Sequence, residues 1–432
     1  MVDHLFRHQY GKLVAILSKI FGLAHLELIE DAIQDTFLQA SLKWRQAQPD
    51  NPQAWLTQAA KNRAIDLMRQ INAQKQRHEK TVHGAATLEI NEYFLDHEVQ
   101  DSQLRMLFVA CHPAFSREEQ IAFALKAISG FSMKEIAVAL LQKEETIKKR
   151  LVRARKKIQE LAITLDYPAA NEINDRLSAV QQIIYLIFNE GFHSTKLNQL
   201  IDKDLCGEAL RLCQLLLVKE QFRSGHLYAL FGLLCFHASR LDSKIVDGKI
   251  VDLKHQDRST WHFPLIVLGN DALNKAMRYP DQSIYHLEAG IAAEHIRAIK
   301  FENTNWQQII DYYNEMFELM PSDSIRLSRA ISYLQMERLA DAKKELDTID
   351  AAAMSQRTYL LHGTYAEYYA KNGEPTQALA AIDKAISTCT NSLEREYLEE
   401  KKAGMTSPDY SCKSFESSAR SVDFSTPVGG SK

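Results

Sequence analysis

Glycine, proline and strand-like alternation are all scarce in this chain. Among 432 residues there are 16 glycines and 10 prolines, and runs that alternate apolar with polar residues are nearly absent. Apolar residues instead recur every three to four positions, which is the spacing of an amphipathic helix. The sequence therefore predicts an all-α fold, made of two small helical domains, the second a helix-turn-helix, followed by a helical-repeat domain.

Cysteines in metal-binding or disulfide patterns and long apolar runs are also missing. The six cysteines fit the spacing of neither a zinc ribbon nor a disulfide framework. We therefore expect reduced thiols in a cytoplasmic protein, with no metal and no cofactor. The N-terminus lacks the basic stretch and apolar run of a secretory signal. The longest apolar runs, such as residues 229–236, are far shorter than the ~20 residues of a membrane span, so we expect no membrane partner.

Common catalytic motifs are absent as well. The sequence has no Walker-type glycine loop, no HExxH motif, no dinucleotide fingerprint and no Gly-x-Ser-x-Gly motif. We therefore expect no enzymatic activity and no catalytic residue. A measured turnover with any nucleotide would contradict this expectation.

Net positive charge is missing overall but present locally. The formal net charge is −3, which by itself argues against nucleic acid as a partner. Residues 117–157, however, hold 11 lysines and arginines against 5 acidic residues, a local balance of +6. This segment has the charge of a phosphate-binding surface.

Composition and periodicity divide the chain into five zones. Residues 1–77 form a helical block that ends in a basic stretch, and residues 78–100 form a polar, acidic linker. Residues 101–163 form a compact basic helical block, and residues 172–404 form a long helical domain. The tail from residue 405 has eight serines and no period, so we expect it to be disordered.

The first block contains a helix with an acidic face, LELIEDAIQDTFLQA. Ile29, Ala32, Ile33, Phe37 and Ala40 form its buried stripe, and the acidic and amide side chains fall on the other side. Such a face suits a basic partner surface, although an ordinary solvated helix face has the same pattern. The residues expected to bind that partner are Glu30, Asp31, Gln34, Asp35 and Phe37.

A second helix follows a short polar loop. Asn51 is a good helix N-cap and Pro52 suits the first turn, while Leu56, Ala60, Ala64 and Leu67 make a core stripe. Cations and amides on the remaining surface suit a DNA backbone, and the loop suits an extruded base. Trp44 and Trp55 are either aromatic surface for bases or packing residues. The residues expected to bind DNA are Asp50, Asn51, Trp55, Lys61, Asn62, Arg63, Asp66 and Arg69.

The run EDAIQDTFLQA followed by NPQAWLTQAAKNRAIDLMRQ resembles region 2 of extracytoplasmic-function sigma factors, closely so at Trp55-Leu56, Asn62-Arg63 and Ile65-Asp66. The resemblance implies that the first helix docks on the β′ clamp helices of core RNA polymerase. It also implies that the second helix and its preceding loop bind and open the −10 element of promoter DNA.

The second block predicts a helix-turn-helix. Ser116 with Glu119, and Ser132 with Glu135, each fit a capping box that marks a helix start. The last helix buries Ile147, Leu151, Ala154 and Ile158 and is cationic on its other side, an arrangement that enters a major groove. Lys143, just before this helix, is a poor N-cap. The residues expected to bind DNA are Lys143, Thr146, Lys148, Lys149, Arg150, Arg153 and Arg155.

SMKEIAVALLQKEETIKKRLVRARKKI resembles region 4 of the same family, which implies that it reads the −35 element and contacts the β flap of core polymerase. The stretch LFVACHPAFSREEQ departs from the family, in which a shorter Leu-Pro–Glu-Arg motif is usual. Cys111-His112-Pro113 is instead typical of a subgroup with a large C-terminal extension.

The long C-terminal domain contains two sequence repeats at an offset of 36 residues. Ala330, Tyr333, Ala342, Leu346 and Ile349 match Ala366, Tyr369, Ala378, Ile382 and Ala385, a pattern that resembles tetratricopeptide repeats. YLIFNEGF and HQDRSTWHFPLI resemble the subgroup's extension, which implies that this domain replaces a separate anti-sigma protein. Polar residues within these motifs form either a binding groove for a protein or small-ligand regulator or a buried hydrogen-bond network.

One rival interpretation remains open from the sequence. A one-component transcription regulator would combine the helix-turn-helix with a helical domain that binds a peptide or small ligand. This interpretation assigns no role to the first helical block, residues 1–77. A sigma factor should co-purify with core RNA polymerase and direct transcription, whereas a one-component regulator should bind an operator tightly without polymerase.

Overall fold

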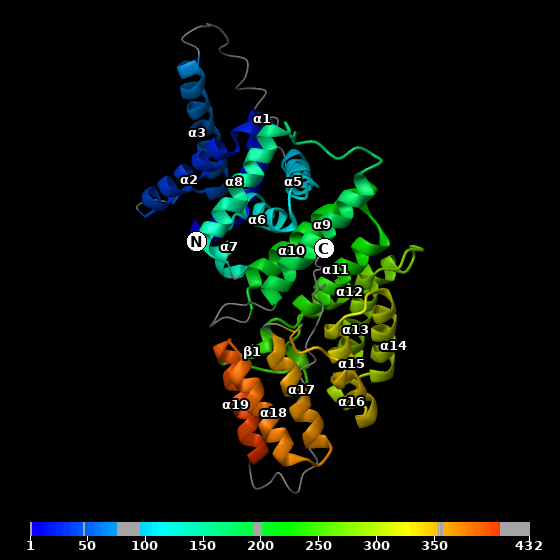
Figure 1. Ribbon diagram of the computed structural model, residues 1–432. Helices are drawn as coiled ribbons and strands as arrows, with labels where there is room; N and C mark the ends of the chain where they lie inside the picture. Colours follow the sequence, from blue (N-terminus) through cyan, green and yellow to red (C-terminus); the bar gives the residue numbers. More distant parts are fainter. Residues whose placement is uncertain are drawn as a thin grey trace. The chain divides into compact units, whose positions relative to one another are not determined.

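The computed structural model describes residues 2–45, 48–75, 96–140, 142–192, 201–352, 354 and 357–406. Within these ranges the regular structure is helical apart from one short hairpin (Figure 1), which confirms the predicted all-α class. The chain divides into two compact units, Met1–Ile187 and Phe188–Lys432. Most of the predicted linker, and all but the first two residues of the predicted tail, lie outside the described residues.

The first unit is built from helices of both predicted blocks. Its regular elements are α1 (Val2–Phe21), the 3-10 helix η1 (Leu23–His25), α2 (Leu26–Lys43), α3 (Pro52–Lys75), α5 (Asp96–Ala110), α6 (Arg117–Ala127), α7 (Met133–Ala139), α8 (Glu144–Glu160) and the first part of α9 (Ile173–Phe192). α1 packs against α2, α3 and α5, and α8 packs against α6 and α7.

The core of the first unit follows the predicted helical stripes. Ile29, Ala32 and Ile33 of α2 are fully buried, as are Leu56 and Ala60 of α3. Each stripe recurs at three and four residues, so one face of each helix is apolar and packs inward. The predicted core of this unit is therefore confirmed at these positions.

The second unit consists mainly of antiparallel helix pairs that follow one another along the chain. Its elements are α10 (Lys203–Val218), η2 (Glu220–Phe222), α11 (Gly225–Ala238), η3 (Asp242–Lys244), β1 (Ile245–Val246), β2 (Lys249–Ile250), η4 (Arg258–Thr260), α12 (Phe263–Ala276), α13 (Ile284–Arg297), η5 (Phe301–Asn303), α14 (Trp306–Leu319), α15 (Asp323–Gln335), α16 (Leu339–Asp347), α17 (Thr358–Lys371), α18 (Pro375–Thr388) and α19 (Ser392–Thr406). In the described part of the whole chain, every helix is too short or too polar to cross a membrane.

The 36-residue repeat corresponds to two helix pairs. α15 packs on α16, and α17 packs on α18. The turn inside each pair has a left-handed residue at the same repeat position, Glu337 with φ 57° and Gly373 with φ 76°. Ala330 and its repeat partner Ala366 are both fully buried, because a small residue there lets the paired helices approach closely. The 36-residue spacing of the sequence repeat is therefore the spacing between two successive helical hairpins, α15–α16 and α17–α18.

Gln256, Arg258 and Trp261 of the HQDRSTW motif pack against other residues, whereas its remaining polar side chains, His255, Asp257, Ser259 and Thr260, are exposed. Arg258 donates from Nη1 to the carbonyl oxygens of His295 and Ala298, and its guanidinium carbon lies 4.7 Å from the centre of the Trp261 ring. Gln256 is buried and donates to the Val251 carbonyl at 3.1 Å. For Gln256 and Arg258 these contacts favour the buried-network interpretation over a binding groove, since their side-chain nitrogens donate to backbone carbonyls.

Glu190 of α9 gives a pH-dependent prediction. Burial raises the pKa of its carboxyl from 4.5 to about 7, and Arg357 opposes this shift. The unfolded chain loses this proton near pH 4.5 but the folded chain keeps it to about pH 7, so rising pH through that window destabilises the fold. Between pH 5 and pH 8, we expect the free energy of unfolding of the wild type to fall by roughly 1–3 kcal/mol relative to that of Glu190→Gln, which cannot ionise at this position. Urea unfolding of both proteins at pH 5 and pH 8 measures these free energies. The same change with pH in both proteins would contradict the prediction.

Candidate nucleic-acid interface

α8 has the features of a DNA-reading helix. Its Ile147, Leu151, Ala154 and Ile158 are buried, which confirms the predicted stripe. The opposite surface is cationic over more than three turns. Lys143 stands at the N-cap without a side-chain capping bond, as expected for a lysine, so the first backbone N–H groups of α8 are not capped by it.

Ion pairs divide the cations of α8 into two groups. Lys149 lies 3.9 Å from Glu145, Lys156 lies 3.4 Å from Glu160, Lys157 lies 2.6 Å from Glu119, and Arg155 pairs with Glu30 of α2. Within the described ranges, Lys148, Arg150 and Arg153 have no carboxylate within ion-pair distance. Lys148 and Arg153 are exposed and Arg150 is half-buried. These three side chains are therefore the ones most available to phosphates.

The helices around α8 begin where the capping boxes predict. Ser116 accepts from the Glu119 N–H at 3.3 Å and donates its own N–H to the Glu119 carboxylate at 2.8 Å. Ser132 and Glu135 repeat the arrangement at 3.2 and 2.8 Å. Between them, Gly130 has φ 71°, a left-handed turn that favours glycine. The predicted helix-turn-helix is therefore present, with α7 and α8 as its two helices.

α3 begins at the predicted cap. The Ala54 N–H donates to Asn51 Oδ1 at 3.0 Å, so this oxygen of Asn51 is occupied in capping. Just inside the helix, Trp55 meets Trp44 edge-on, with ring centres 5.5 Å apart, and Lys43 lies 5.9 Å from the Trp55 ring. The two tryptophans therefore pack on each other where α2 ends and α3 begins.

The predicted DNA-facing residues of α3 differ in exposure. Asn62, Asp66 and Arg69 are exposed. Lys61 is only 2% exposed, so its predicted position on the open face is wrong. Burial lowers the pKa of this lysine. Arg63 is half-buried and donates from Nε and Nη2 to Asp35 Oδ2 at 2.9 and 2.7 Å, so a predicted DNA contact and a predicted polymerase contact neutralise each other.

The acidic face of α2 is narrower than predicted. Asp31 and Gln34 are exposed, and Asp35 is half-buried. Glu30 is 3% exposed, so its expected place on the exposed face is wrong, because Arg155 lies against it. Phe37 is 5% exposed and packs in the core, as its place in the apolar stripe predicts, so its ring is covered by neighbouring residues.

Two leucines extend the exposed face of α2. Leu38 and Leu42 are 62% and 59% exposed, and they follow Asp31 and Asp35 at helical spacing of three and four residues. They share one side of the helix with the two carboxylates. Neither leucine was among the predicted site residues, although the helical spacing of positions 31, 35, 38 and 42 in the sequence places them on the same side as the two carboxylates. The resulting surface, which we call the α2 face, consists of Asp31, Gln34, Asp35, Leu38 and Leu42.

Acidic neighbours and partial burial change the ionisation of the α2 face. Burial, and then the carboxylates of Glu27 and Asp35, raise the pKa of Asp31. The clustered carboxylates repel one another, and a basic partner surface would relieve that repulsion. The face thus combines negative charge with two exposed apolar side chains.

Comparison with known proteins finds three families along the chain. Residues 5–74 match sigma-70 region 2, residues 105–158 match sigma-70 region 4, and residues 176–277 match a family of unknown function, DUF6596. An uncharacterized protein of Rhizobium meliloti (strain 1021) is 32% identical over 384 residues, which cover 87% of this chain and 89% of that protein. No solved structure matches. The chain belongs to the sigma-70 family, whose regions 2 and 4 act in promoter recognition and RNA polymerase binding.

Proposed function

We propose that this sigma factor uses three surfaces of its first unit to bring core RNA polymerase to promoters. The α2 face docks on the β′ clamp helices, the loop at Asn51 with α3 binds and opens the −10 element, and α8 binds the −35 element beside the β flap. The observation that carries the proposal is α8. It completes a helix-turn-helix, it exposes Lys148 and Arg153 with Arg150 half-buried beside them, and it follows the region 2 helices in the same chain.

The second unit is proposed to regulate these surfaces. Residues 188–432 are more than half of the chain, and the alignment with the Rhizobium meliloti protein covers 87% of this chain, so that protein shares most of the extension. Repeated helix pairs such as α15–α16 and α17–α18 form extended surfaces that suit a peptide or protein ligand. A cytoplasmic regulator of this kind would replace a separate anti-sigma protein.

In vitro transcription with purified core polymerase over genomic fragments tests the main proposal. We expect specific run-off products that require both the full chain and core polymerase, and co-purification of the two. Tight, sequence-specific DNA binding without polymerase, together with no transcription, would instead favour a one-component regulator.

Removal of the extension tests the regulatory proposal. A chain that ends at residue 171 keeps α1–α8 and lacks α9 and the second unit. We expect its transcription level or its response to cell extract to differ from that of the full chain. Unchanged activity, promoter choice and regulation would contradict a regulatory role for the second unit.

A further inference from the structure

One side of α12 in the second unit packs closely on α11. A Cβ built on Gly232 of α11 would lie 3.1 Å from the carbonyl oxygen of Gly269, and Ala272 on the same side of α12 is 3% exposed. The start of the helix is fixed as well, since the His262 N–H donates to the Ser239 carbonyl at 2.7 Å. Small residues on this side let the two helices approach closely, so the rest of α12 is presented on a rigid support.

An open side of α12 presents a stripe of large apolar side chains. Phe263, Val267 and Met277 are 68%, 49% and 71% exposed, Leu273 is half-buried, and Asn270 is exposed at the middle. Met277 follows the last helical residue but keeps helical backbone angles, φ −66° and ψ −8°. The stripe is therefore about 21 Å long at ~1.5 Å per residue. We call Phe263, Val267, Asn270, Leu273 and Met277 the α12 stripe.

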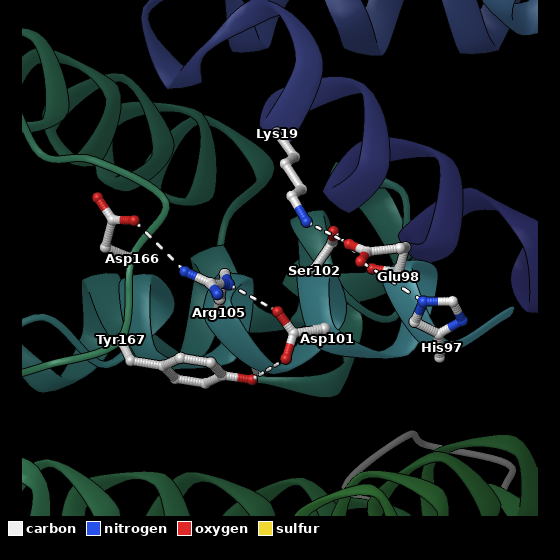
Figure 2. Close-up of polar contacts among 8 residues, drawn as sticks. All are labelled: Lys19, His97, Glu98, Asp101, Ser102, Arg105, Asp166 and Tyr167. Carbon is white, nitrogen blue, oxygen red and sulfur yellow. Dashed lines mark hydrogen bonds and ion pairs between the residues drawn. The ribbon is translucent and has the colours of Figure 1, made fainter. Parts of the chain in front are cut away.

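A helix that is held by another segment of the chain looks different at its polar side chains. On α5, the Asp101 carboxylate accepts from the Tyr167 hydroxyl, 66 residues further along the chain, at 2.7 Å (Figure 2). On α12, the charged residues beside the stripe pair with each other, since Lys275 donates to Asp271 at 2.7 Å. The stripe itself contains no charged residue. A partner can therefore cover it without burying an unpaired charge.

The spacing of the α12 stripe is symmetric about Asn270. Phe263 and Met277 lie seven residues before and after it, and Val267 and Leu273 lie three residues before and after it. If two copies of α12 pack antiparallel about a twofold axis at Asn270, Phe263 of each copy meets Met277 of the other, and Val267 meets Leu273. Asn270 then meets itself, and its amide both donates and accepts. A central asparagine of this kind fixes the register of paired helices.

We propose that the α12 stripe pairs two copies of this chain, with α12 of one copy antiparallel to α12 of the other about Asn270. A second copy is the favoured occupant because the stripe is complementary to itself, in the positions of its apolar residues and in its lack of charge. One helical stripe covers less area than a permanent dimer buries, so the pairing is weak and depends on concentration. It uses the second unit alone and does not depend on the proposed function.

Charges at residue 270 test the symmetry in the full chain. Sedimentation equilibrium between about 1 and 200 µM protein should show a reversible dimer of the wild type. Asn270→Asp and Asn270→Lys each place like charges opposite each other at the axis, so we expect each to raise the dimer Kd by about tenfold or more. A one-to-one mixture of the two variants should recover the dimer, because opposite charges then meet. The position is exposed, and circular dichroism should show an unchanged fold.

Asn274→Asp and Asn274→Lys are the matched controls. Asn274 is exposed on the next turn of the same helix, but in the proposed pairing its two copies lie about 12 Å apart along the helix axis. Mixing these two variants should therefore give little gain in dimer. A wild type that stays monomeric, Asn270 variants that pair like the wild type, or a mixture that recovers no dimer would each show the pairing to be wrong.

Other occupants of the α12 stripe give distinct results. A full chain that dimerises only after residues 407–432 are removed would assign the stripe to the C-terminal tail. Protection of α12 from hydrogen exchange by core polymerase, with no dimer at any concentration, would assign it to polymerase. Either result overturns self-pairing. Failure of the chain to bind polymerase would overturn the proposed function and leave the dimer measurement unaffected.

Discussion

Reversing the charge of Arg150 and Arg153 together is expected to weaken binding to promoter duplex on the order of 100-fold at physiological salt. Each lost phosphate contact should also reduce the slope of log affinity against log salt by about 0.9. We expect a large effect because Arg150 and Arg153, like Lys148, have no carboxylate within ion-pair distance in the described ranges, whereas the other cations of α8, Lys149, Arg155, Lys156 and Lys157, do. Fluorescence anisotropy of a promoter fragment at several salt concentrations measures both quantities.

The control for this variant separates a local contact from overall charge. Lys371→Glu with Lys384→Glu changes the net charge by the same amount on α17 and α18 of the second unit. We expect this pair to leave the affinity and the salt slope near wild type. Equal losses in the two double variants would mean that α8 contributes only to the general field of the protein, and would contradict its role as the −35 helix.

The features that could be predicted from the sequence are those that depend on near neighbours in the chain. The capping box at Ser116 and the cap at Asn51 span three residues, and the α8 stripe repeats within one helix. Such signals need no knowledge of the tertiary structure. The hairpin of β1 and β2 was missed although its turn, Asp247-Gly248, has the left-handed φ values of 52° and 78° that this pair favours.

The errors in the predicted site come from partners that are distant in the sequence. Glu30 was predicted to be exposed because the apolar pattern of α2 contains no information on Arg155, its partner 125 residues further along the chain. Helical periodicity describes one helix, and whether a charged residue beside its apolar stripe is buried depends on the groups that another element brings to it. Lys61 shows the same limit on α3. Predicting whether a charged residue next to an apolar stripe is exposed therefore requires the tertiary structure.

The α2 face carries the second large prediction. Leu38→Asp is expected to weaken binding to core polymerase at least tenfold, which corresponds to about 1.4 kcal/mol. Full burial of a leucine contributes roughly 1.5–3 kcal/mol, and a carboxylate at the same place would have to be desolvated. The substitution should leave the fold intact because Leu38 is 62% exposed. Titration of labelled core polymerase measures the affinity, and run-off transcription should fall in parallel.

Leu319→Asp provides the matched control for this prediction. Leu319 ends α14 in the second unit and is 65% exposed, so the same chemical change is made at a similar exposure away from the α2 face. If Leu319→Asp binds polymerase like wild type and Leu38→Asp does not, the exposed leucines of α2 belong to the docking surface. If the two variants bind alike, the carboxylates of Asp31 and Asp35 would have to orient polymerase without apolar contact at Leu38. The affinity for polymerase would then fall strongly as salt is added, because ions weaken the attraction between exposed charges over a distance of about 10 Å at 0.1 M salt.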